Sequence, residues 1–154
     1  MQNTFFENMR NEGRTYEAAK ELRKAEKKAL MDADNWDAVK AWNEREEREF
    51  PFPFTGGAMK AFNAYENTNY KHANAFLVTD LPWERDIPDF VETLREAGIT
   101  EIAIADQSTA LMESLHTLAA NGCQMTGLTK VEIDGNGWTE PERITVNGIT
   151  MTIA

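Results

Sequence analysis

The sequence predicts an α+β fold in which an N-terminal helical hairpin precedes a small α/β unit. Residues 15–49 are dense in strong helix formers, whereas residues 75–133 alternate short apolar runs with segments of helical apolar spacing. Apolar residues then alternate with Thr and Asn over residues 143–153, as in half-buried strands. The predicted regions are a helical region (1–50), a connector rich in Pro, Gly and Asn with a short helix (51–73), and an α/β domain (74–154).

Two antiparallel helices are predicted at the N-terminal end of this fold. The Asp-Ala-Asp-Asn segment at residues 32–35 interrupts the helical pattern that begins at Thr15, and Asp34 or Asn35 can cap a second helix. Helices joined by so few residues must lie roughly antiparallel. We expect the contact between them to be made by Leu22, Leu30, Val39 and Trp42.

The α/β domain is predicted to hold a mixed sheet of about five strands with two crossover helices. Residues 75–79, 101–105 and 125–133 are short apolar runs suited to strands. Between them, one helix is expected to begin at Asp86 and another to be capped by Asp106 or Ser108. Strands separated by helices imply crossover connections, so the first three strands are expected to be parallel.

A β-hairpin is predicted at the end of the sheet. Residues 143–146 and 149–153 flank the dipeptide Asn147-Gly148, which is typical of a tight type I′ turn. Together these two runs would supply the fourth and fifth strands.

The charge of the chain limits the classes of partner. The 16 Lys and Arg residues against 26 Asp and Glu give a net charge of −10, and most of the excess lies after residue 50. Direct binding to nucleic acid requires a basic surface, so we expect none. No apolar run approaches the roughly 18 residues that a membrane span requires. We therefore expect no membrane contact and a cytoplasmic location.

Recognisable catalytic and metal-binding groupings are missing from the sequence. His72 and His116 are the only imidazoles and Cys123 the only thiol, and no spacing of His and Cys is typical of zinc. Cys123 should follow the end of a helix, where the dipole opposes a thiolate, so a structural role is expected. We expect no metal and no cofactor, and the chain is more plausibly not an enzyme.

One part of the chain resembles a known family. Residues 90–99 (FVETLREAGI) and 106–128 (DQSTALMESLHTLAANGCQMTGL) are similar to a family of small uncharacterised bacterial proteins from mobile elements or phage of gut bacteria. The resemblance covers roughly residues 75–133. It implies an accessory role in a mobile element, with no enzymatic activity and no assigned site residues.

These observations favour a protein-binding accessory factor. Its acidic surface could imitate a polyanion towards a basic, nucleic-acid-binding host protein, as an anti-CRISPR-like inhibitor would. Three- and four-residue spacing places several carboxylates together on one helix. The candidate partner-binding residues are Glu84, Asp86, Asp89, Glu92 and Glu96.

The alternative is a small ligand-binding or enzymatic domain. If the first two strands are parallel, the residues that follow them share the carboxyl edge of the sheet, where open α/β folds bind ligands. The carboxylates there would oppose an anionic ligand such as a nucleotide phosphate. The simpler structural interpretation is that these residues cap helices and that Trp83 covers an edge. The candidate residues are Asp80, Trp83, Asp106, Gln107 and Ser108.

Overall fold

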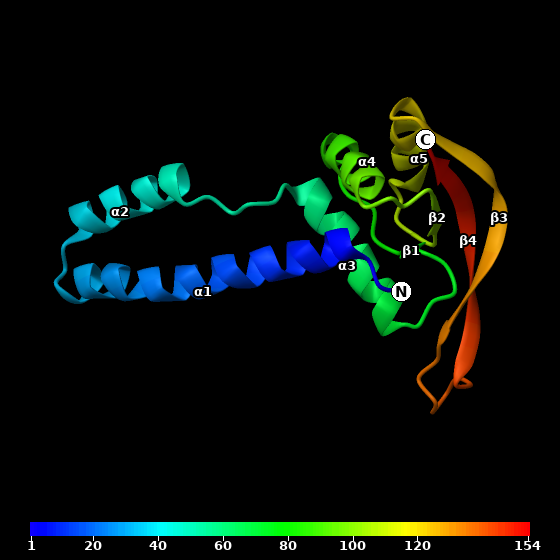
Figure 1. The fold of residues 1–154 in the computed structure, drawn as a ribbon, viewed down its shortest axis with the longest axis horizontal. Helices are drawn as coiled ribbons and strands as arrows, with labels where there is room; N and C mark the ends of the chain where they lie inside the picture. Colours follow the sequence, from blue (N-terminus) through cyan, green and yellow to red (C-terminus); the bar gives the residue numbers. More distant parts are fainter. The chain divides into compact units, whose positions relative to one another are not determined.

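The computed structural model describes residues 1–154, which form two compact units. One unit is Glu7–Phe54, and the other combines Met1–Phe6 with Thr55–Ala154. None of the helices has both the length and the apolar character that crossing a membrane requires. The elements, labelled in Figure 1, are the helices α1 (Thr4–Asp32), α2 (Trp36–Glu49), α3 (Gly56–Tyr70), η1 (Glu84–Asp86, a 3₁₀ turn), α4 (Ile87–Glu96) and α5 (Leu111–Ala120), and the strands β1 (Leu77–Val78), β2 (Glu101–Ile104), β3 (Cys123–Asp134) and β4 (Arg143–Ile153).

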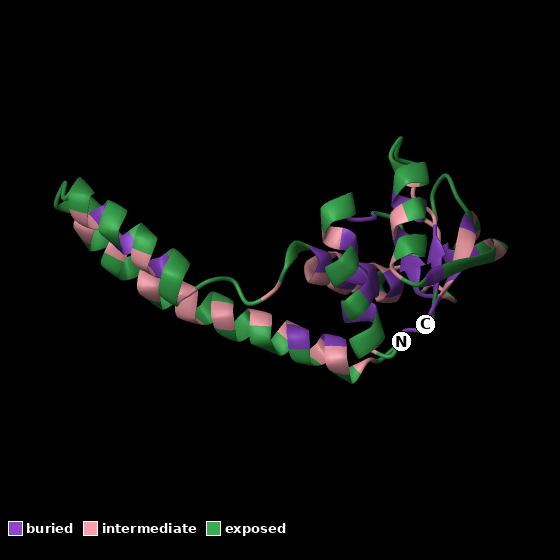
Figure 2. Cartoon of the chain, turned by 90° about the horizontal axis from the view of Figure 1, so that it is seen from above, coloured by how far each residue is buried: buried purple, intermediate pink, exposed green.

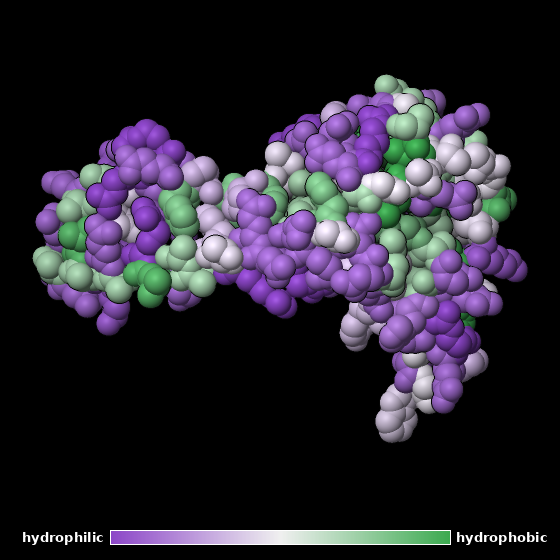
Figure 3. Space-filling model, in the orientation of Figure 1, coloured by the Kyte–Doolittle hydropathy of each residue, from purple (hydrophilic) through white to green (hydrophobic).

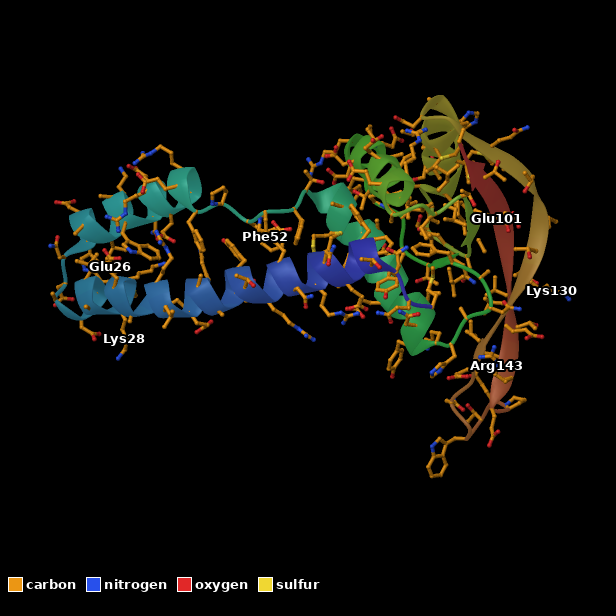
Figure 4. All side chains as sticks on the ribbon, viewed as in Figure 1. Glu26, Lys28, Phe52, Glu101, Lys130 and Arg143 are labelled. Carbon is orange, nitrogen blue, oxygen red and sulfur yellow. The ribbon has the colours of Figure 1, made fainter.

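The first unit is the predicted helical hairpin. Asn35 caps α2 by accepting a hydrogen bond from the amide of Ala38 at 3.3 Å. Ion pairs tie the two helices in antiparallel order. Arg23 Nε lies 2.7 Å from the carboxylate of Glu46, and nearer the turn Arg45 contacts Glu26 at 2.9 Å. Figure 4 shows Glu26 between α1 and α2.

The residues that join these helices differ from the prediction. Val39 and Trp42 are buried, but Leu22 is 81% exposed and Leu30 is only half-buried. Long basic side chains of α1 cover the aromatic rings instead, with Lys27 Nζ 5.6 Å from the Trp42 ring. Such side chains can bury their aliphatic stems while their charges stay near water. They can therefore cover an aromatic ring of α2 although the face of α1 towards α2 has few large apolar residues.

The N-terminal residues belong to the core of the second unit. α1 begins at Thr4, eleven residues before the predicted start at Thr15. Phe6 is completely buried, and its ring stacks on Tyr65 of α3 at a centroid distance of 4.8 Å. The Asn3 side chain donates a hydrogen bond to the carbonyl of Ala97 at 2.9 Å. Residues that precede the predicted helix therefore form part of the core.

The sheet of the second unit has four strands in the order β1-β2-β4-β3, rather than five. β1 and β2 are parallel, as predicted, with Leu77 opposite Ala103. The last strand, β4, is inserted between β2 and β3 and is antiparallel to both. The third predicted strand is therefore not a neighbour of the second. Helices α4 and α5 lie on one face of the sheet (Figure 1).

The predicted turn at Asn147-Gly148 does not exist, because both residues lie inside the continuous strand β4. A type I′ turn needs positive φ at both positions, and neither residue has it. A Cβ on Gly148 would lie 3.1 Å from the carbonyl oxygen of Ile104, so glycine here permits close strand approach. The true hairpin joins β3 to β4 through residues 135–142.

The base of this hairpin is tied to the segment that follows α3. Arg143 donates hydrogen bonds to the Asp134 carboxylate and to the carbonyl of His72, both at 2.9 Å. Contacts with His72 and Arg143 lower the pKa of Asp134. Figure 4 shows Arg143 at the start of β4.

Helix α3 packs against α4 with unusually little space between their backbones. The buried residues of α3 are mostly small, and buried residues of the unit gather around α3, α4 and the sheet (Figure 2). A Cβ on Gly57 would lie 2.6 Å from the backbone nitrogen of Phe90, closer than real contacts allow. Gly57 therefore sets the position of α4, which carries the candidate partner-binding residues Asp89, Glu92 and Glu96.

Candidate functional site

The carboxylates of α4 form one exposed row because the opposite face of the helix is the core. Ile87, Phe90, Val91 and Leu94 are completely buried, at the spacing that the sequence predicts for the apolar side of a helix. Asp89, Glu92 and Glu96 consequently face solvent. Glu84 of η1 is also exposed, whereas Asp86 is half-buried at the start of α4. We call Glu84, Asp86, Asp89, Glu92 and Glu96 the acidic row.

Few basic side chains neutralise the acidic row. Glu92 lies 3.5 Å from Arg95, and Asp86 lies 3.9 Å from Arg85. Glu84, Asp89 and Glu96 form no ion pair. Arg95 is also engaged elsewhere, because it donates to the carbonyl of Ala154 at 2.7 Å. The surface over the upper part of α4 is hydrophilic in Figure 3.

A hollow of about 510 Å³ adjoins the acidic row at the carboxyl ends of β1 and β2. Trp83 stands at its rim with 73% of the side chain exposed, next to Glu84. Leu81 and Pro82, both buried, supply apolar lining. We call this feature the Trp83 hollow. Its lining is completed by Lys60, Asp80, Asp106, Ser108, Thr109, Ala110 and Ser114.

Asp106 is held rigidly at the hollow by two backbone amides. One carboxylate oxygen accepts from the amide of Leu81 at 2.9 Å, and the other accepts from the amide of Ser108 at 2.7 Å. Burial disfavours the charged carboxylate, but these hydrogen bonds outweigh burial and lower the pKa of Asp106. The predicted helix cap is therefore wrong, since α5 begins at Leu111 after Ala110. Asp106 instead ties the loop after β1 to the loop after β2.

We expect Asp106→Ala to lower the free energy of unfolding by about 1–2 kcal/mol, because it leaves the Leu81 amide without its acceptor. Urea unfolding of both proteins across a pH series would measure the effect. A lowered pKa means that this stabilisation is present above the ordinary value of 3.8 and is lost as pH falls through the lower folded value. A stability difference that stays unchanged however far the pH is lowered below 3.8 would contradict this account.

The structure brings most of the predicted edge residues together. Asp80, Trp83, Asp106 and Ser108 all line the Trp83 hollow, whereas Gln107 lines a different hollow with Asn67 and Lys71. The residues that line the same hollow from other helices are Lys60 of α3, which pairs with Asp80, and Ser114 of α5. No local sequence pattern identifies Lys60 as a residue of this site. Ser114 is a polar residue on the same side of the helix as the apolar residues Leu111, Leu115 and Leu118. This position is the sequence signal that could have identified it as a site residue.

The remaining reactive side chains lie outside this site. Cys123 is 5% exposed at the start of β3, and burial raises the pKa of its thiol. A thiol in this state is a poor nucleophile, in accord with a structural role. No three His, Cys, Asp or Glu side chains converge as a metal site would require.

The fold and the site define the class of protein. It is a small α+β protein with an acidic row on one helix, an exposed tryptophan and an adjoining hollow.

Residues 60–153, more than half of the chain, match the domain of unknown function DUF7698, and the chain belongs to this family. This range contains residues 75–133, where the sequence resembles an uncharacterised family, and the match brings no activity with it. No curated protein and no solved structure matches the chain.

Proposed function

We propose that the chain is a non-enzymatic, protein-binding factor that binds a basic segment of a partner protein. The supporting observation is the acidic row, three of whose five carboxylates form no ion pair, beside a tryptophan that is 73% exposed. Exposed aromatic residues often supply much of the binding energy in interfaces, and unpaired carboxylates attract basic partners. The two features occupy adjacent elements, η1 with its preceding loop and α4.

The charge of the whole chain supports the same function. A net charge of −10 accelerates encounter with a basic partner, and the rate falls as salt screens the attraction. It also disfavours contact with nucleic acid itself.

More specifically, we propose that the protein is a cytoplasmic accessory factor of a mobile element. Its carboxylates would compete with nucleic-acid phosphates for a basic host protein, as an anti-CRISPR-like inhibitor does. The support for this form is the resemblance of residues 75–133 together with the acidic row, and it depends on the partner being a nucleic-acid-binding protein.

A second candidate is a ligand-binding or enzymatic domain acting at the sheet edge. The observation that favours it is the Trp83 hollow, where Asp80, Trp83 and Asp106 meet at the carboxyl ends of parallel strands. A small-molecule ligand that binds there with no salt dependence would support this candidate over the first.

Reversing two charges of the acidic row is expected to weaken binding to a basic segment. In Asp89→Lys with Glu92→Lys, affinity for a nine-residue peptide of Lys and Arg should fall about tenfold at low salt, because two attractive contacts become repulsive. Isothermal calorimetry across a salt series would measure this. Wild-type affinity should itself fall steeply as the screening length shortens to about 10 Å at 0.1 M salt.

The matched control is Glu140→Lys with Glu142→Lys, which changes the net charge equally at exposed residues of the β3–β4 loop. This variant should lose much less affinity than the α4 variant. Equal losses would mean that net charge alone attracts the peptide. Undetectable binding by the wild type at low salt would contradict the proposed function.

A further inference from the structure

The Trp83 hollow offers a combination of groups that suits one cationic side chain. We propose that it receives the guanidinium group of an arginine from the partner's basic segment. This inference rests on the proposed function, because it identifies the residue that would anchor that segment. The groups that would contact the guanidinium are Trp83, Glu84, Asp106 and Ser114, around an apolar lining of Leu81 and Pro82.

Asp106 is the fixed anionic acceptor of the hollow. The Leu81 and Ser108 amides each occupy one of its oxygens, so the carboxylate cannot rotate away. Each carboxylate oxygen can accept a second hydrogen bond, and a guanidinium can donate two in parallel. A fixed acceptor favours binding because little conformational entropy is lost when the ligand arrives.

Ser114 is an unused polar group in the same hollow. It is only 5% exposed, yet its hydroxyl makes no hydrogen bond to another group of the protein. Its oxygen is not sealed from solvent, and the residue lines the hollow. Water can therefore reach this hydroxyl in the free protein, and a donor from a ligand in the hollow can replace that water.

Trp83 and the apolar lining complete the match with arginine. An indole face attracts a guanidinium by a cation–π interaction, and planar arginine stacks on it better than lysine does. Leu81 and Pro82 can contact the aliphatic stem of the ligand. Arginine carries five donors in a planar fork, whereas the three donors of lysine diverge from one point. Acceptors spread over Asp106, Glu84 and Ser114 therefore favour arginine.

The charges of the hollow select a cation. Lys60 pairs with Asp80 and its charge also acts on Asp106, but three carboxylates, those of Asp80, Glu84 and Asp106, share this one basic side chain in the hollow. The site is therefore net negative and repels phosphate or carboxylate ligands. The charge of Lys60 opposes a second cation, so the hollow binds one arginine.

The experiment uses the full-length ¹⁵N-labelled protein and three peptides of one sequence, Gly-Gly-Xaa-Gly-Gly, in which Xaa is Arg, Lys or citrulline. The arginine peptide should shift the indole N–H signal of Trp83 and the backbone signals of Asp106 and Ser114 in a saturable manner. The lysine peptide should bind about tenfold more weakly, because it cannot donate to all the acceptors. Citrulline, which is uncharged but similar in shape, should produce no saturable shift.

Variants identify the hollow as the binding site. Ser114→Ala should weaken the arginine peptide about three- to tenfold by removing one acceptor, with no loss of stability, since the hydroxyl has no partner to lose. Thr117→Ala, on the same helix but outside the hollow, is the matched control and should bind normally. Trp83→Leu should reduce binding further than Ser114→Ala.

The outcomes separate this inference from the proposed function. Equal affinity for the arginine and lysine peptides, or an unchanged affinity in Ser114→Ala, would overturn the arginine site. The proposed function would survive either result if the nine-residue basic peptide still bound through Asp89 and Glu92. If that longer peptide bound the wild type and the Asp89→Lys, Glu92→Lys variant equally while the arginine peptide bound the hollow, the acidic row would be wrong and the arginine site would stand.

Discussion

Replacing Gly57 with alanine is expected to lower the free energy of unfolding by about 2 kcal/mol. The added Cβ would lie 2.6 Å from the backbone nitrogen of Phe90 and 2.9 Å from Cβ of Asp89. A backbone cannot rotate aside as a side chain can, so α3 and α4 must separate, at a cost of about 3 kcal/mol. Alanine recovers about 1 kcal/mol through its better helix propensity. Urea unfolding followed by circular dichroism would measure the net change.

Gly56→Ala is the matched control, because it makes the same substitution one residue earlier. Its Cβ would meet only the Asp86 carboxylate, at 3.3 Å, and that side chain can move. We expect a change within about 0.5 kcal/mol. The Gly57 variant should also bind the nine-residue basic peptide less tightly, since a displaced α4 carries Asp89 and Glu92 with it. Full stability in Gly57→Ala would show that the two helices are less tightly held than the structure indicates.

Replacing Phe6 with alanine is expected to lower the free energy of unfolding by about 3–5 kcal/mol. The Phe6 ring is completely buried, stacks on Tyr65 at 4.8 Å and lies 6.1 Å from the Phe76 ring. Its removal leaves a cavity between α3 and the segment before β1, and the aromatic contacts are also lost. Urea unfolding would measure the loss.

The control for Phe6 is Phe52→Ala, in which the same side-chain atoms are removed from a ring that is 44% exposed. Its effect should be below about 2 kcal/mol, because water already reaches much of the ring. Similar losses in both variants would contradict the assignment of Phe6 to the core of the second unit.

Much of the secondary structure could be predicted from local sequence. The apolar spacing of Ile87, Phe90, Val91 and Leu94 predicts both the existence of α4 and its buried face, and the structure confirms each of these. Gly98 ends that helix at a φ of 75°, and the amide of Ile99 bonds back to the carbonyl of Leu94 at 2.9 Å. Signals of this kind depend on neighbours within one or two turns, so the chain itself carries them.

The sequence-based predictions were wrong where contacts with distant segments decide the local structure or the burial of a residue. Asn147-Gly148 has the composition of a turn, but β3 pairs with β4 through both of these residues and β2 pairs with residues 149–152. This pairing outweighs the local turn preference. The burial of Phe6 depends on a pocket formed by Tyr65 and Phe76, more than fifty residues later. A local sequence pattern cannot indicate a packing partner that lies so far away in the chain.

For the candidate site, the sequence by itself determined the carboxylates of α4 and the polar residues that follow two strands. Helical spacing and strand ends are local properties, so both sets could be placed on a helix face and a sheet edge. Only the tertiary structure decided that Lys60 and Ser114 join Trp83 at one hollow, and that Gln107 does not. That grouping depends on how α3 and α5 each pack against α4, through contacts such as that of Gly57 on α3 with Phe90 on α4, which lie far apart in the chain.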